Sequence, residues 1–378
     1  MGHDASVDDL YTPERIATAQ QAVLASGLQA LLIAPSADLR FLTGYDAHQL
    51  ERLTCLVLPA EGAATLVVPT LERPAAEASP APGTGLVIVD HADGSNPYPL
   101  VRTALGAAVR PGATVGVGNR MFAEHVLGLR DALPELQQQL AGPVLRELRM
   151  RKTPAEVAAL AAAGAAIDSV HARMGDWLRP GRTEHEVAVD ILDAIRASGH
   201  ATADFAIVAS GPHGASPHHG TSERVIAEGD PVVVDIGGTM PSGYCSDSTR
   251  TYIAGGEPPA EFAAYYAILF EAQNAAVDVV RPGVTCEAVD AAARDVIADG
   301  GYGDAFLHRT GHGIGMDGHE DPYIVAGNAL PLEAGMAFSI EPGIYLSGRH
   351  GARIEDIVVC TTDGVRRLNN RPTDLVYL

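Results

Sequence analysis

Four acidic residues lie inside or beside apolar, strand-like runs in the second half of the chain. They are Asp235 in Val-Val-Val-Asp-Ile-Gly, Asp247 in Cys-Ser-Asp-Ser-Thr-Arg-Thr, Glu341 in Phe-Ser-Ile-Glu-Pro-Gly and Glu355 in Ala-Arg-Ile-Glu-Asp-Ile-Val-Val. Burying an unpaired carboxylate is costly, so four that gather in one place need positive charge among them. His312, in His308-Arg-Thr-Gly-His312-Gly-Ile-Gly, lies between the two pairs. The pattern predicts a metal site, and the four charges favour two ions.

The candidate ligands combine hard carboxylate oxygens with one imidazole nitrogen and no thiolate. This set suits Mn²⁺, Co²⁺, Fe²⁺ or Zn²⁺ better than Ca²⁺. Four negative charges match two divalent ions, which carboxylates can hold about 3.5–4 Å apart. Such ions polarise a carbonyl and lower the pKa of a water molecule toward about 7. We therefore expect hydrolysis of an acyl or amide bond.

Each of these residues also has an interpretation without a metal. A lone aspartate in a strand usually faces solvent, Glu341 could mark the end of a strand, and His312 between glycines could belong to a turn. Glu355 and Asp356 are adjacent, so strand alternation sends them to opposite faces and predicts that one is at the surface. Arg353 shares the face of Glu355 and could pair with it. The ordered occurrence of all five candidates favours the metal site.

Further histidines surround the candidate ligands: His218 and His219 before the Asp235 strand, His308 before His312, and His319 after it. Imidazoles near a metal could stabilise an oxyanion or pass a proton to a leaving amine. Each could equally be a surface or core histidine. The His319-Glu320 pair does not make a zincin motif, because position 323 is tyrosine where that motif has its second histidine.

The elements that must position these residues appear twice. Arg179-Pro-Gly-Arg-Thr183 and Arg281-Pro-Gly-Val-Thr285 each separate two helical stretches, and each is followed by strand-like runs with two of the acids. The offset is 102 residues for the Arg-Pro-Gly units, 106 from Asp235 to Glu341 and 108 from Asp247 to Glu355. Coincidence is an alternative, since Arg-Pro-Gly is a common helix stop. The pattern favours a duplicated half-domain in which each half donates two carboxylates about a pseudo-twofold axis.

The length of 378 residues suggests two domains. In the first we expect an α/β pattern, with helices at 13–24 and 98–109 and strands at 30–34, 54–58, 65–68 and 86–89. The composition turns basic near Val144, so we place a boundary between domains 1–145 and 150–378. In the second domain, Thr-x-x-Glu capping boxes at Thr153 and Thr183 start helices, and the first of these should run to about Leu178.

Composition limits the location and the partners. The net charge of −21 repels phosphate backbones and argues against nucleic-acid binding. No apolar run approaches the roughly 18 residues of a membrane span. The polar, acidic start Met1–Asp9 lacks the features of a signal peptide. Four scattered cysteines without a Cys-x-x-Cys pair fit a reducing cytoplasm.

Six ordered motifs resemble the metallopeptidases with the pita-bread fold, which include methionine aminopeptidase, aminopeptidase P and prolidase (Xaa-Pro dipeptidase). They are Val234-Asp-Ile-Gly-Gly, Gly243-Tyr-Cys-Ser-Asp-Ser-Thr-Arg-Thr, His308-Arg-Thr-Gly-His-Gly-Ile-Gly, His319-Glu-Asp-Pro, Ile340-Glu-Pro-Gly-Ile-Tyr and Gly351-Ala-Arg-Ile-Glu-Asp. Residues 1–145, with Phe41-Leu-Thr-Gly-Tyr, resemble the creatinase/prolidase N-terminal domain. The resemblance implies an α/β N-terminal domain and an α+β catalytic domain with internal pseudo-twofold duplication.

The resemblance also implies roles for single residues. Asp235, Asp247, His312, Glu341 and Glu355 would bind two divalent ions, most naturally Mn²⁺ with Co²⁺ or Zn²⁺ as alternatives, and Asp247 and Glu355 would bridge them. His218 and His319 would line the pocket and act in catalysis with Glu341, while His308 and Arg353 would support the pocket. His218 fits the family's Pro-His position better than His219.

Two departures from the family pattern are visible. Asp235 and Asp247 lie 12 positions apart where the family usually has 11, and we assign the extra residue to the turn at Pro241-Ser242. Tyr323 stands where some dipeptidases carry an arginine that helps to hold the substrate carboxylate. We count Tyr323 among the substrate-binding residues, and the preference for dipeptides stays open.

The leading hypothesis is a cytoplasmic, homodimeric peptidase that depends on Mn²⁺ or Co²⁺ and cleaves Xaa-Pro bonds in small peptides. We expect a dipeptidase first and an aminopeptidase P second. Two rival hypotheses are a creatinase-like hydrolase without metals and a non-catalytic binding protein on the same scaffold. The intact set of five ligands argues against both.

Overall fold

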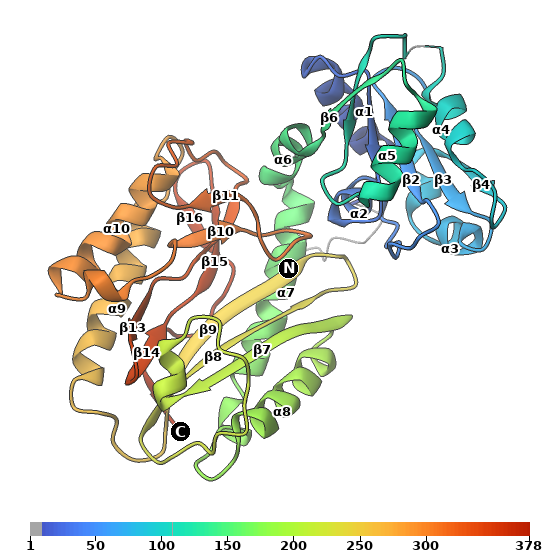
Figure 1. Cartoon of the computed structure of the whole chain (residues 1–378). Helices are drawn as coiled ribbons and strands as arrows, with labels where there is room; N and C mark the ends of the chain where they lie inside the picture. The colour runs from blue at the N-terminus through green and yellow to red at the C-terminus, as the bar shows by residue number, and fades with distance from the viewer. Residues whose placement is uncertain (1–9, 108) are drawn as a thin grey trace. The chain divides into compact units, whose positions relative to one another are not determined.

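The computed structural model describes residues 10–107 and 109–378 (Figure 1). The chain divides into two compact units, Met1–Arg149 and Met150–Leu378. The N-terminal segment Met1–Asp9, on which the expectation of no signal peptide rests, lies outside the described residues. Within the described ranges, no helix combines the length and the apolar composition that a membrane span needs.

A six-stranded sheet forms the centre of the N-terminal unit. Its order is β4 (Val87–His91), β3 (Thr65–Pro69), β2 (Cys55–Pro59), β1 (Ala30–Ile33), β5 (Thr114–Val117) and β6 (Gln137–Leu140). The pairs β1·β2 and β2·β3 are antiparallel, and the other three are parallel. The four strands predicted from apolar runs are confirmed, with ends that differ by one or two residues.

The helices of this unit are α1 (Pro13–Ala25), α2 (Ala37–Thr43), α3 (Arg73–Ala78), a 3-10 helix (Ala81–Thr84), α4 (Tyr98–Leu105), α5 (Ala123–Ala132) and α6 (Gly142–Met150). Residues of β1, β2 and β5 form one core cluster with residues of α4 and α5. The predicted helix at 98–109 is too long. The α4 helix ends at Leu105 because Gly106 takes a positive φ of 64°, which is incompatible with a right-handed helix.

The C-terminal unit consists of two similar halves. The first contains α7 (Pro154–His171), a 3-10 helix (Met174–Asp176), α8 (Glu184–Ala197), β7 (Thr202–Ser210), a 3-10 helix (Gly211–Ala215), β8 (Asp230–Thr239) and β9 (Cys245–Ala254). The second contains α9 (Phe262–Asp278), α10 (Cys286–Asp299), a 3-10 helix (Gly303–Ala305), β10 (Gly311–Gly313), β11 (Glu320–Ile324), β12 (Ala337–Ile340), β13 (Gly343–Leu346), β14 (His350–Arg353), β15 (Asp356–Cys360) and β16 (Val365–Arg367), and β17 (Val376–Tyr377) follows. Each half has two helices before its strands, as the predicted duplication requires.

The strands of the two halves form the inner layers of this unit. One sheet has the order β17-β9-β8-β7, a second has the order β11-β10-β12-β15-β16, and β13 pairs with β14. Figure 1 shows α8 on one flank and α9 and α10 on the other, with the strands between them. One core cluster joins α7 and α8 to β8 and β9, and another joins α9 and α10 to β12 and β15. The pita-bread architecture is confirmed.

Both predicted capping boxes are present. The side chain of Thr153 accepts the backbone N–H of Glu156, and that of Thr183 accepts the backbone N–H of Glu186. The predicted extension of the first helix to Leu178 is wrong, because α7 ends at His171. The chain passes into the 3-10 helix Met174–Asp176, and Met174 and Leu178 are both buried in the core of this half.

Buried His171 should make the stability of the fold depend on pH. Its Nε2 donates to the carbonyl oxygen of Ser248 at 3.1 Å, and its Nδ1 accepts the hydroxyl of Tyr252 at 2.9 Å. Burial, with the charge of Arg250 as the second cause, lowers the pKa of His171 to about 3. In the unfolded chain a histidine titrates near pH ~6.5. Below that pH the unfolded chain gains a proton that the folded protein does not.

We therefore expect the free energy of unfolding to decrease as the pH falls from about 6.5 toward about 3. The contribution of His171 should reach about 1.4 kcal/mol per pH unit. Urea unfolding of the metal-free wild type and of His171→Gln, compared at about pH 7 and about pH 5, measures it. The variant should lose less stability between the two pH values. Equal losses would contradict the assignment.

Candidate metal centre

The β8–β9 hairpin supplies the first pair of acids. Its antiparallel register pairs Gly237 with Asp247 and Asp235 with Thr249. Because residues two apart in a strand share a face, the carboxylates of Asp235 and Asp247 lie on the same side of the sheet. The register has no shift along the hairpin, whose turn comprises residues 240–244.

The second pair lies where β12 ends and β15 begins. Ile340 pairs with Asp356, so one further step in the same register brings Glu341 opposite Glu355. Glu355 is also tied to the first half. Its N–H donates to the carbonyl of Thr249 at 3.1 Å, and the hydroxyl of Thr249 donates to its Oε2 at 2.8 Å. The two pairs of acids are therefore held against each other by direct contacts between the halves.

His312 in β10 supplies the nitrogen. Its Nδ1 donates to the carbonyl of Gly313 at 3.1 Å, which leaves Nε2 to face the acids. Nε2 lies 3.2 Å from Oε1 of Glu341 and 3.7 Å from Oδ2 of Asp247. The ring of His319 lies over that of His312, with ring centroids 3.7 Å apart. The histidine thus joins acids from both halves.

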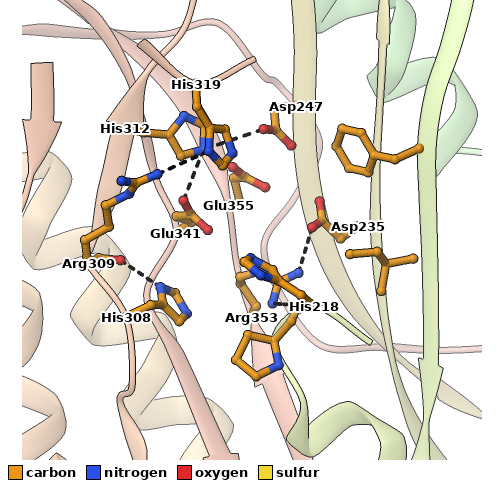
Figure 2. A pocket seen from close by; sticks show the side chains of 13 residues that line it. His218, Asp235, Asp247, His308, Arg309, His312, His319, Glu341, Arg353 and Glu355 are labelled. Carbon is orange, nitrogen blue, oxygen red and sulfur yellow. Dashed lines mark hydrogen bonds and ion pairs between the residues drawn. The ribbon is translucent and has the colours of Figure 1, made fainter. Parts of the chain in front are cut away.

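All five predicted ligands converge on one cavity of about 540 Å³, which Figure 2 shows. Its lining comprises Phe205, Ile207, Pro217, His218, Asp235, Asp247, His308, Arg309, His312, His319, Glu341, Arg353 and Glu355. Ligand atoms of Asp235, Asp247 and Glu355 lie within 4.8 Å of one another, and so do those of His312, Glu341 and Glu355. Glu355 belongs to both groups, so two neighbouring groups share one carboxylate.

The acids perturb one another strongly. Burial raises the pKa of Asp247 well above its ordinary value, and the charge of Asp235 adds to this effect. Burial, followed by the charge of Asp247, likewise raises the pKa of Glu355. Burial opposes ionisation of Glu341 as well, but the hydrogen bond and charge of His312 lower its pKa to about 2. The centre contains more negative charge than its own side chains neutralise.

These residues fit a divalent metal ion. The Oδ1 atom of Asp235 is buried and has no hydrogen-bond partner among the described residues. Leaving such an acceptor unpaired costs about 1–3 kcal/mol, or more when it is charged. A cation between the acids would supply the missing partner and offset the repulsion that raises the pKa values of Asp247 and Glu355. Four carboxylates and one imidazole are donors that divalent transition metals accept.

Arg353 orients one of the acids. Its Nη2 donates to Oδ2 of Asp235 at 2.7 Å, its Nη1 to the hydroxyl of Tyr345 at 2.9 Å and its Nε to the hydroxyl of Thr249 at 3.1 Å. Strand alternation suggested Glu355 as the carboxylate partner of Arg353, but its ion pair is with Asp235. The pairing crosses from one half to the other.

His308 lines the same wall. Its Nδ1 donates to the carbonyl of Arg309 at 2.7 Å, so Nε2 accepts the hydroxyl of Tyr345 at 2.8 Å. Burial lowers the pKa of His308, which keeps the ring neutral at physiological pH. Tyr345 also accepts Arg353, so a hydrogen-bonded chain connects His308 to the arginine that holds Asp235.

The two adjacent histidines have different environments. His218 lines the cavity, whereas His219 turns away and its Nε2 lies 3.0 Å from Oε2 of Glu184. Glu184, fully buried, also lies 3.0 Å from Nδ1 of His213 and accepts the hydroxyl of Ser222 at 2.6 Å. These contacts fix the loop that carries His218.

Sequence reasoning overlooked part of the cavity wall. Phe205 and Ile207 alternate along β7, and Ile207 pairs with Asp235, so strand alternation could have placed them there. Arg309 also lines the cavity, although nothing in its type or position separated it from a solvent-facing arginine. The structure does not bring Tyr323 onto this wall. Instead, Cζ of Arg309 lies 4.5 Å from the centroid of its ring.

The expectation that either Glu355 or Asp356 is at the surface is wrong. Each is 1% exposed. Asp356 lies on the opposite face of the strand, where its Oδ1 pairs with Nη2 of Arg250 at 2.7 Å and its Oδ2 with Nη1 of Arg367. Both faces of this strand are buried, so neither of two successive side chains reaches solvent.

Two family models match the chain. Residues 158–362 match metallopeptidase family M24, and residues 15–151 match the creatinase/prolidase N-terminal domain. A curated relative, "Probable dipeptidase PepE" of Mycobacterium bovis, is 56% identical over 364 residues, which is 96% of each chain. The Xaa-Pro dipeptidase of Lactobacillus helveticus is 35% identical over 339 residues, which is 89% of this chain and 91% of that protein.

The fold has a close counterpart among solved structures. The crystal structure of dipeptidase PepE from Mycobacterium ulcerans aligns with a TM-score of 0.90 at 55% identity. The alignment covers 100% of this chain and 99% of that one. The similarity therefore extends through both units.

Proposed function

Because the chain belongs to metallopeptidase family M24, we propose that it hydrolyses Xaa-Pro dipeptides and uses two divalent ions to do so. The observation that carries the proposal is the convergence of five predicted ligands from both halves on one cavity. Its volume of about 540 Å³ suits a small peptide. The name of the Lactobacillus helveticus relative supports the preference for a bond before proline.

We assign the ligands as two overlapping sets. Asp235 would serve one ion, His312 and Glu341 would serve the other, and Asp247 and Glu355 would be shared. The donor set suits Mn²⁺, with Co²⁺ or Zn²⁺ as alternatives. When bound, such ions polarise the scissile carbonyl and lower the pKa of a water molecule.

The surrounding side chains would carry the proton and orient the substrate. Glu341 is ionised at neutral pH because its pKa is low, so it would accept the proton of the attacking water. His319 is neutral, since burial first and the charge of His312 second lower its pKa to about 4. Arg309 donates to Nδ1 of His319 at 3.2 Å, which leaves the proton on Nε2. His218 and His319 would donate to the developing oxyanion, and His308 and Arg353 would hold the pocket in place.

A peptide panel tests the substrate. The Mn²⁺-loaded protein should hydrolyse Ala-Pro at least about tenfold more efficiently than Ala-Pro-Ala, because a tenfold preference needs only about 1.4 kcal/mol of transition-state discrimination. Pro-Ala, which has the same composition but no bond before proline, is the control and should resist cleavage. Equal cleavage of Ala-Pro and Ala-Pro-Ala would favour aminopeptidase P. Cleavage of Pro-Ala but not Ala-Pro would refute the proposal, and a protein without bound metal would refute the role of the ions.

The resemblance to the family also leads us to propose a cytoplasmic homodimer. All four cysteines are free and buried, in keeping with a reducing compartment. Cell fractionation tests the compartment, and light scattering that returns the mass of one chain would contradict the dimer.

A further inference from the structure

Two guanidinium groups line the cavity, and they differ in what they bind. The donors of Arg353 are engaged by Asp235, Tyr345, Thr249 and the carbonyl of Pro217. The guanidinium of Arg309 makes one hydrogen bond, from Nη2 to Nδ1 of His319, and has no ion pair with any residue in 10–107 or 109–378. Because a guanidinium has five N–H donors, most of those of Arg309 are available to a ligand.

Tyr323 fixes the orientation of this guanidinium. Cζ of Arg309 lies 4.5 Å from the centroid of the Tyr323 ring, a distance typical of a cation stacked on an aromatic face. This contact restricts the positions that the guanidinium can take. A guanidinium carries pairs of N–H donors whose spacing matches a planar group with two oxygens, which is the geometry of a carboxylate.

The position of Arg309 relative to the metal centre is also specific. Its hydrogen-bond partner His319 stacks on the candidate ligand His312, with centroids 3.7 Å apart. The guanidinium of Arg309 therefore lies next to His319, the residue that would donate to the oxygen of the scissile carbonyl. Figure 2 shows it reaching from the cavity wall toward these two rings. One residue of extended chain spans at most about 3.6 Å, so a dipeptide places its terminal carboxylate close to the bond that is cut.

We propose that Arg309, held by Tyr323, binds the C-terminal carboxylate of the substrate through two N–H···O bonds and thereby selects dipeptides over longer peptides. The inference rests on the proposed peptidase function. In a longer peptide the same position holds an uncharged amide, which cannot form this ion pair. A cation at this position also provides local attraction for a substrate carboxylate in a chain whose net charge is −21.

The kinetic test compares Ala-Pro with its C-terminal amide, which lacks only the negative charge. In Arg309→Met, KM for Ala-Pro should rise roughly 10- to 100-fold, the loss expected when hydrogen bonds to a charged group are removed. Loss of the hydrogen bond to His319 should lower kcat equally for Ala-Pro and the amide, and the KM for the amide should change little. Arg309→Lys keeps the positive charge but lacks the paired N–H donors of a guanidinium. Its KM for Ala-Pro should lie between those of the wild type and Arg309→Met. Arg366→Met, at an exposed position of the same unit, is the matched control and should behave as the wild type.

A second pair of variants tests the role of Tyr323. Tyr323→Phe keeps the aromatic face and should raise KM for Ala-Pro less than Tyr323→Ala does. Tyr323→Ala removes that face, and KM for Ala-Pro should rise while KM for the amide does not. A rise with both substrates in Arg309→Met or Tyr323→Ala would show a general disturbance of the cavity and would overturn the inference.

A binding measurement separates this inference from the proposed function. The ligand is a reduced analogue of Ala-Pro, with a methylene in place of the scissile carbonyl, and its carboxamide is the comparison. By calorimetry, the Mn²⁺-loaded wild type should bind the acid roughly 10- to 100-fold more tightly than the amide, and Arg309→Met should bind the two equally. Equal or undetectable binding by the wild type would overturn the role of Arg309 even if Xaa-Pro bonds are cleaved. A clear acid preference in a protein that cleaves no Ala-Pro would contradict the proposed function alone.

Discussion

Replacing Asp247 with alanine should abolish both the binding of metal and the hydrolysis of Ala-Pro. We assign its carboxylate to both groups of ligands, so its loss would affect both ion positions. Residues that only support a metal ligand are typically worth about 10–100-fold in affinity or activity. The loss of a shared ligand should therefore lower kcat/KM by more than about 100-fold. Elemental analysis of the purified variant should show a lower metal content than that of the wild type.

The stability of the metal-free protein distinguishes loss of metal from loss of fold. Burial and the charge of Asp235 raise the pKa of Asp247, so this carboxyl is a cost to the metal-free fold. Metal-free Asp247→Ala should consequently resist urea at least as well as the metal-free wild type. Asp363→Ala, at an exposed position of the same unit, is the control and should keep both metal and activity. Full metal content and turnover in Asp247→Ala would refute the centre.

Replacing Asp356 with alanine should lower the free energy of unfolding by about 3–5 kcal/mol, which is typical when one partner of a buried ion pair is removed. Asp356 and Arg250 are 1% and 3% exposed, and 2.7 Å separates Oδ1 from Nη2. The alanine variant would leave the guanidinium of Arg250 buried without a carboxylate. Urea unfolding of the metal-free proteins measures the loss.

Two further variants check the cause of that loss. Asp356→Asn keeps an oxygen that can accept from Arg250 and should lose less stability. The double variant Asp356→Ala/Arg250→Met removes both charges and should recover part of what the single variant loses. If the single and double variants were equally unstable, the unpaired charge of Arg250 would not be the cause.

The sequence predicted that the four acids lie together because a carboxylate in an apolar run is unusual enough to carry information. Strand alternation and the repeat then grouped Asp235 with Asp247 and Glu341 with Glu355, and the structure places each pair together. The same alternation failed at Asp356. Its partners Arg250 and Arg367 come from other strands. The sequence around Asp356 does not indicate ion pairs with residues of other strands.

Two other errors arose where contacts with distant parts of the chain, rather than the local sequence, determine the structure. The edge strand β6 reads Gln-Gln-Gln-Leu, without the apolar or β-branched residues that usually indicate a strand, and it forms through backbone pairing with β5. The end of α7 was placed too late because the first proline after Pro154 is Pro180, while the burial of Met174 and Leu178 depends on the core beneath them. Likewise, the stacking of Arg309 on Tyr323 joins residues that only the folded chain brings together.

The division of the proposed ligands between the two halves of the C-terminal unit has a consequence for how this unit unfolds. An ion held by Asp235 and Asp247 on one side and Glu341 and Glu355 on the other loses ligands as soon as either half opens. Its binding free energy would then add to the free energy required to open either half. Bound ions would act as a reversible crosslink that makes the two halves unfold as one cooperative unit. The supply of metal in the cell would set the lifetime of the chain against proteolysis as well as its rate of turnover.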